Sequence, residues 1–74
     1  MAIDYAGLLT DEQKKELLQS RISQFAAEAY QHEMNLKIAK ATDNDEATEN
    51  AEKALEILDA AIVVHQTELK KFDK

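Results

Sequence analysis

The fold is decided by the stretch LQSRISQFAAEAYQHEMNLKIA, residues 18–39. Apolar or small side chains, with one histidine among them, recur in it at alternating intervals of four and three residues: Leu18, Ile22, Phe25, Ala29, His32, Leu36 and Ala39. This alternation lines one face of an α-helix and is the seam of a coiled coil. We therefore predict a long amphipathic helix that packs against a second helix along this seam.

The limits of this helix are marked by its flanking residues. Thr10 and Gln13 have the spacing of a capping box, in which each side chain accepts a hydrogen bond from the backbone amide of the other residue. The turn segment, residues 42–45, concentrates side chains that bond to nearby backbone and compete with helix. We predict a helix over residues 10–41, a turn over 42–45, and an N-terminal arm over 1–9 that contains the single glycine.

A second seam follows the turn and predicts a second helix over residues 46–72. Its members are Ala47, Ala51, Ala54, Leu58, Ala61, His65, Leu69 and Phe72. Two long helices joined by a short turn lie antiparallel. The predicted fold is all-α, a coiled-coil-like antiparallel two-helix hairpin that forms a single domain over 1–74. If the chain folds back near residue 43, Ala29 faces Leu58, and Ile22 faces His65.

Size and composition point to self-association. A domain of 74 residues buries only about 60% of the surface of its unfolded chain. Small domains are usually reinforced by disulfides, a structural metal or a partner, and this chain has no cysteine. We therefore expect an oligomer.

Apolar residues outside the two seams indicate where the subunits meet. On a helical projection they form a second stripe on the first helix and an apolar segment on the second, and two helices cannot bury both faces of each other. We predict that two hairpins dimerise into a four-helix bundle. The predicted interface residues are Ala27, Tyr30, Met34, Ile38, Ile57, Ala60, Val63 and Val64.

The net charge of −6 is concentrated in the second helix, where residues 43–59 hold seven acids and one lysine. An acidic ridge consists of Glu49, Glu52, Glu56 and Asp59. Direct binding to nucleic acid is disfavoured, because phosphate contacts need clustered basic side chains. One interpretation is a mimic of the nucleic-acid backbone that occupies a basic groove of a target protein. The other is a solvated face whose acids favour the N-terminal end of the helix dipole.

No pattern for catalysis or metal binding is complete. His32 begins the string HEMNL, but Leu36 stands where a zinc-protease motif has its second histidine. A calcium loop beginning at Asp43 would need glycine at position 48 and glutamate at 54, which are Thr48 and Ala54. The two histidines are interpreted as seam residues that fix the register or lie half exposed. We expect a protein that is not an enzyme and has no metal or cofactor.

The cellular location is inferred from the lack of a secretory signal pattern and of an apolar run long enough to span a membrane. Asp4 stands where a secretory signal would carry positive charge, and no long apolar segment follows it. The longest apolar run, residues 60–64, is far shorter than the roughly 20 residues of a membrane span. We expect a cytoplasmic protein that does not associate with membranes.

The run LLTDEQKKELLQSRISQFAAEAYQHEMN, residues 8–35, with the acidic turn and AIVVHQTEL, residues 61–69, resembles small helical proteins of unassigned function encoded by tailed bacteriophages. The resemblance covers most of the chain and contains no catalytic motif. It implies a product made in the bacterial host cytoplasm that either joins the virion or binds a host protein. No site residues can be transferred from it.

Two functions are consistent with these patterns. The first is a non-enzymatic protein–protein interaction module that forms a homodimer and serves as a virion or assembly component or as an adaptor. The alternative is an acidic phage inhibitor that binds a host nucleic-acid-binding protein through the acidic ridge. The two differ in their response to salt, because ionic contacts are screened and apolar contacts are not.

Overall fold

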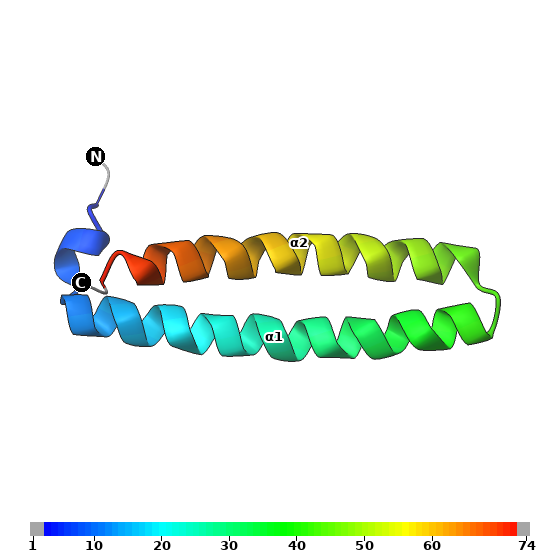
Figure 1. The fold of residues 1–74 in the computed structure, drawn as a ribbon. Coiled ribbons are helices and arrows are strands. Elements are labelled where there is room, and N and C mark those ends of the chain that lie inside the picture. Colours follow the sequence, from blue (N-terminus) through cyan, green and yellow to red (C-terminus); the bar gives the residue numbers. More distant parts are fainter. Residues whose placement is uncertain (1–2, 73–74) are drawn as a thin grey trace.

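The computed structural model describes residues 3–72 and contains two antiparallel helices joined by a tight turn (Figure 1). α1 spans Asp11–Ala41, α2 spans Asp45–Lys70, and a short 3-10 helix, η1, spans Ala6–Leu8. The prediction of an all-α antiparallel hairpin is confirmed. Residues 1 and 2 of the predicted arm, and residues 73 and 74, lie outside the part of the chain that the structure describes.

The first helix begins at the predicted capping box. The Thr10 hydroxyl accepts a hydrogen bond of 3.1 Å from the Gln13 amide, and the Gln13 side chain accepts one of 2.9 Å from the Thr10 amide. Thr10 is the N-cap, so the helix proper starts one residue later than predicted. Asp11 and Glu12 place negative charge at the positive end of the helix dipole. The local sequence therefore determines where α1 starts.

The turn is one residue shorter than predicted, because Asp45 is already helical. Asn44 caps α2, its side-chain oxygen accepting a hydrogen bond of 3.0 Å from the Ala47 amide. The Asn44 amide donates to the Ala39 carbonyl at 2.9 Å, and the Asp43 amide donates to the Lys40 carbonyl at 3.3 Å. These two bonds form a Schellman motif. At its other end α2 stops at Lys70, two residues before the predicted end.

Asp43 has a left-handed backbone conformation, with φ of 54°. It occupies the position after the helix C-cap where glycine is the usual residue, because a Cβ atom is strained there. We expect Asp43→Gly to raise the free energy of unfolding by about 0.5–1 kcal/mol, as relief of strain of about 1–2 kcal/mol is partly offset by the greater backbone entropy of glycine. Urea titration followed by circular dichroism measures this change. Asp43→Ala, which keeps the Cβ atom, is the control and should give no gain.

The two predicted seams form the contact between the helices. Every seam residue on α1 and α2 is half-buried or buried. Three are buried: Ala39 at 3%, Ala51 at 5% and Leu58 at 8% exposure. His65 contacts Arg21 and Phe25, which flank the predicted partner Ile22. The contacts therefore agree with the predicted register.

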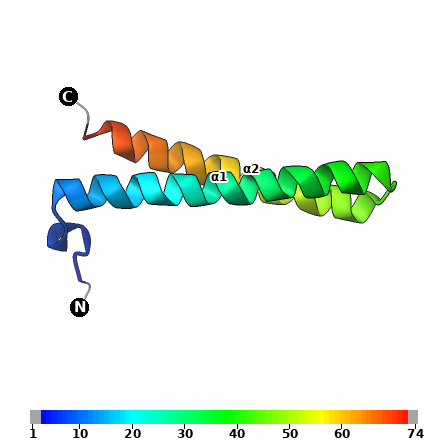
Figure 2. The ribbon, with the colours of Figure 1, turned by 90° about the horizontal axis from the view of Figure 1, so that it is seen from below.

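The hairpin is a single layer of helices with no second layer to cover it. Its principal extents are 49 × 32 × 14 Å, and its radius of gyration is 16.4 Å, whereas a compact chain of this length has about 11 Å. Viewed from below, the helices overlap near the turn and their other ends lie apart (Figure 2). The end remote from the turn is called the open end from here on. Both broad sides of the hairpin face solvent.

Candidate interaction surface

Large apolar side chains outside the seams are exposed. Tyr30 is 62% exposed, Ile57 70% and Val64 58%, and Ile38 and Val63 are similar. Among the other predicted interface residues, both alanines are exposed and Met34 is half-buried. The hairpin by itself therefore leaves most of these side chains in contact with water.

The predicted interface residues form two separate patches. The α1 patch consists of Ala27, Tyr30, Met34 and Ile38, and the α2 patch of Ile57, Ala60, Val63 and Val64. Successive residues are rotated by about 100° around a helix. Met34 is two residues from the seam residue Leu36 and therefore points away from α2. Ile57 and Val64 each precede a seam residue and therefore lie beside the seam, on one broad side. Val63, two residues before the seam residue His65, points away from α1, so the α2 patch extends from this broad side onto the outer edge of α2. One flat partner surface cannot cover this patch and the α1 patch together.

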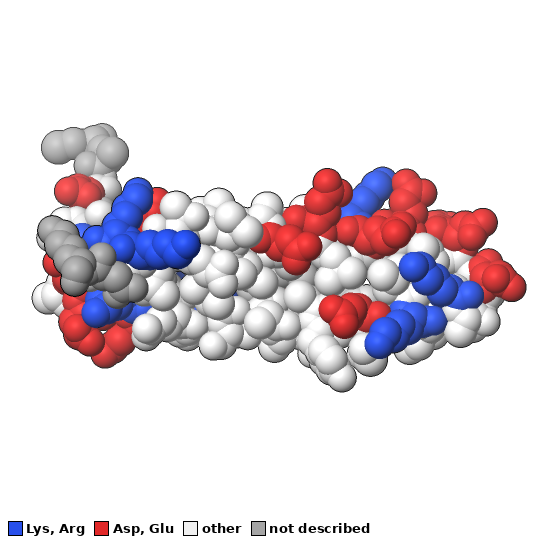
Figure 3. All heavy atoms as spheres, in the orientation of Figure 1, with Lys and Arg blue, Asp and Glu red and all other residues white. Residues whose placement is uncertain are grey.

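The two helical segments at the middle of the hairpin contain no charged residues of their own. Residues 22–27 of α1 and 60–67 of α2 contain no Asp, Glu, Lys or Arg. The contacts of His65 with Phe25 place these two segments side by side. Together they form the uncharged belt, and Figure 3 shows it on one face as a white middle between two charged ends. The belt could not be recognised from either helix alone, because it depends on the register between them.

A three-residue cluster connects the helices at the belt. The Arg21 side chain donates from Nε to His65 Nε2 at 3.1 Å and lies over the Phe25 ring, 4.9 Å from its centre. The Phe25 and His65 rings meet edge to face at 5.0 Å. His65 Nδ1 lies 2.7 Å from the Ala61 carbonyl, which can only accept, so Nδ1 holds the proton and Nε2 accepts from Arg21. Half-buried His65 thus joins the two helices through its contacts with Arg21 and Phe25.

His32 lies in a different setting. It is half-buried and lines an open hollow of about 330 Å³ together with Asn35, Ala47, Asn50 and Ala51. Within residues 3–72 no three His, Cys, Asp or Glu side chains are grouped so that they could hold a metal ion. His32 and His65 therefore do not meet at a common site within one chain.

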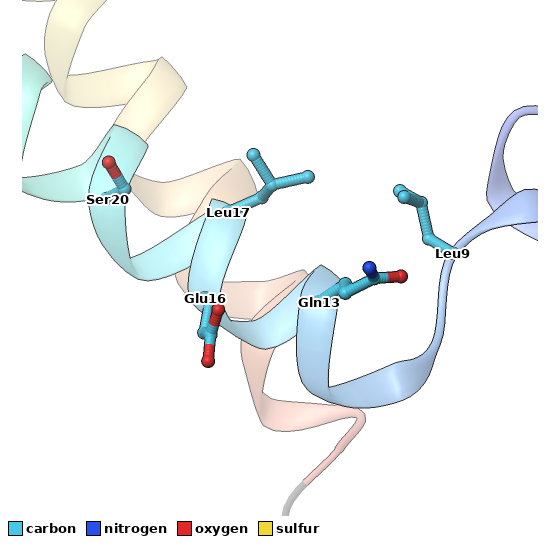
Figure 4. A pocket seen from close by; sticks show the side chains of 5 residues that line it. All are labelled: Leu9, Gln13, Glu16, Leu17 and Ser20. Atoms are coloured by element: carbon cyan, nitrogen blue, oxygen red, sulfur yellow. The ribbon is translucent and has the colours of Figure 1, made fainter.

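Helical periodicity did not predict two of the open hollows at the open end, which are lined by residues of the arm and of α1. One, of about 380 Å³, is lined by Leu9, Gln13, Glu16, Leu17 and Ser20. In Figure 4 the side chains of Leu9, just before α1, and Leu17 point toward each other across it. The second hollow, of about 250 Å³, shares these two leucines and is also bordered by Phe72. They arise where the arm folds back toward α1, a contact that helical periodicity does not encode.

The four residues of the acidic ridge, Glu49, Glu52, Glu56 and Asp59, are all exposed. Acidic side chains follow α2 along its half nearer the turn (Figure 3). One of them, Glu49, pairs with Lys53 at 3.1 Å, and both side chains are two-thirds exposed. Such a solvated pair contributes only about 0–1 kcal/mol. The ridge is therefore open to solvent and to a basic partner.

A comparison of the chain with family models finds no match, and the searches of curated proteins and of solved structures find none either. Between residues 3 and 72, no helix has the length and apolar character needed to cross a membrane.

Proposed function

We propose that this protein is a non-enzymatic interaction module that forms a homodimer, with two hairpins packed as a four-helix bundle. The observation that carries the proposal is the exposure of large apolar side chains in the α2 patch. Burial of a Val or Ile side chain is worth about 1.5–3 kcal/mol, and a domain of this size has only about 3–5 kcal/mol of stability. A second copy that covers the patch therefore stabilises the fold itself.

The hairpin exposes more surface than a compact monomer of its mass, and this excess supports a partner of about its own size. The chain exposes 5921 Å², whereas a compact monomer of 8.4 kDa exposes about 4600 Å². The excess of about 1300 Å² exceeds the roughly 800 Å² that each partner buries in a standard interface. A dimer with a standard interface would remove more than half of this excess.

The biological setting that we propose rests on the resemblance of the sequence to small helical proteins of tailed phages. In this setting the dimer is made in the host cytoplasm and serves as a virion or assembly component or as an adaptor. Its exposed α1 patch, which points away from the seam, remains available for a further protein.

The acidic ridge favours a second candidate function. In this candidate the chain inhibits a host nucleic-acid-binding protein, and Glu49, Glu52, Glu56 and Asp59 enter its basic groove. The support for it is that all four are exposed along one side of α2. Such a complex depends on ionic contacts and weakens as salt rises.

Sedimentation equilibrium at low and high salt tests the proposed dimer. We expect twice the chain mass of 8.4 kDa at micromolar concentration, both at about 0.1 M salt and at about 1 M, where the Debye length falls from about 10 to about 3 Å. The melting temperature should rise with protein concentration, since a partner that binds only the folded state stabilises it. A monomer with a concentration-independent melting temperature would contradict the proposal.

A further inference from the structure

The charge of the chain is divided unequally on the two sides of the uncharged belt. The half that includes the turn, residues 28–59, holds nine acids and three lysines, a net charge of −6. The open half, residues 3–21 and 68–72, holds five acids and five bases, a net charge of 0. The whole net charge of the chain therefore lies on one side of the belt.

The belt lies near the middle of the hairpin along its length. α1 spans Asp11–Ala41, so its middle falls within the belt segment 22–27. Three residues of the α2 patch, Ala60, Val63 and Val64, also lie in the belt. The α1 patch is placed differently, because apart from Ala27 its residues belong to the acidic turn half. The α2 patch is thus the more central of the two apolar surfaces, and the one charged group that reaches its part of the belt among the described contacts is the Arg21 guanidinium, held against His65 and Phe25.

We propose that the second copy packs on the α2 patch in the antiparallel orientation, with the two turns at opposite ends of the bundle and the two-fold axis crossing the uncharged belt. This inference rests on the proposed dimer and adds its geometry. In this arrangement α2 of one copy lies against α2 of the other, and their Val64 side chains meet near the axis. The uncharged belt of one copy contacts the uncharged belt of the other at the centre of the interface.

Electrostatics selects this orientation over the parallel one. A parallel dimer also brings the uncharged belts of the two copies together, but it places the turn half of one copy, with its net charge of −6, beside the turn half of the other. The antiparallel dimer places the −6 half beside the neutral half, which carries Lys70 at the end of α2 and Lys71 just after it, where Lys71 pairs with Glu68 at 3.1 Å. By helical rise, Glu56 of one copy then lies level with Lys71 of the other. Like charges held close together disfavour association, and opposite charges favour it.

Distances between spin labels distinguish the two orientations, and the absence of native cysteine makes single labelling sites available. Ala41→Cys places a label next to the turn, and Ser23→Cys places one in the belt; both positions are exposed. At 1.5 Å rise per residue, the Ala41 labels of an antiparallel dimer lie about 50 Å apart along the bundle. In a parallel dimer they lie about two helix diameters apart, roughly 20–24 Å.

The expected result is a long distance for Ala41→Cys and a short one for Ser23→Cys, measured by pulsed dipolar spectroscopy on proteins whose helical spectrum matches the parent. Short distances at both sites would overturn the antiparallel orientation and leave the dimer standing. No dipolar coupling between copies at either site, with monomers in sedimentation, would overturn the dimer and its orientation together.

Discussion

Replacing Val64 with aspartate is expected to convert the dimer into a monomer. Within one hairpin Val64 is 58% exposed, and Val and Asp have similar helix propensities. The substitution should therefore change the stability of an isolated hairpin by no more than about 0.5 kcal/mol. At the two-fold axis, however, both copies would bring a carboxylate into an apolar contact, which costs several kcal/mol for each unpaired charge.

Together these terms predict that dimer affinity falls by about 1000-fold or more, which corresponds to about 4 kcal/mol. Sedimentation equilibrium measures the affinity, and thermal melts at two concentrations show whether the melting temperature still depends on concentration. Gln19→Asp is the matched control, because it adds the same charge at an exposed polar position of α1. If Val64→Asp associates and melts like the parent, the α2 patch is not the contact between copies.

The second large effect is expected for Leu58→Ala. Leu58 is the largest of the three buried apolar side chains, with 8% exposure. Truncation of a buried leucine costs about 2–5 kcal/mol, which is comparable to the roughly 3–5 kcal/mol that a domain of this size has in total. The variant should therefore be largely unfolded at concentrations where the parent is folded. Urea unfolding followed by far-UV circular dichroism measures the loss.

The neighbouring Ile57 provides the control for this effect. Ile57 is 70% exposed in the hairpin and belongs to the α2 patch. Ile57→Ala should lower stability only at concentrations where the dimer forms, whereas Leu58→Ala should lower it at every concentration. Equal losses for the two variants in dilute solution would show that the seam does not hold the hairpin together in the way the structure indicates.

The fold could be predicted from sequence because its determinants are local and periodic. The four–three spacing from Leu18 to Ala39 defines the seam, and a capping box is a short-range pattern. The conformation of Asp43 could not be predicted, because Asp, Asn and Thr are all acceptable in such a turn and only one of them takes the left-handed position. The end of α2 was placed two residues late because Phe72 continues the apolar period without remaining helical.

The candidate surface was only partly accessible to the same reasoning. Helical projection identified the exposed side chains one helix at a time, and most of them are exposed in the structure. It did not show that the α1 and α2 patches point in different directions, since that depends on how the helices pack. The Arg21–Phe25–His65 cluster and the uncharged belt likewise require the register between residues more than 35 positions apart in sequence.

Within residues 3–72 the buried residues are Ala39, Ala51 and Leu58, and all three lie in the turn half of the hairpin. Seam residues of the open half are only half-buried, and two hollows flank them. Local stability depends on the number of buried contacts, so the free energy of local opening is higher in the turn half than in the open half. We therefore expect partial unfolding to start at the end remote from the turn, and amide hydrogens near Leu18 and Leu69 to exchange with solvent sooner than those near Leu36 and Leu58. The capped turn is then expected to stay folded while the open end frays, so that the two helices close again from it.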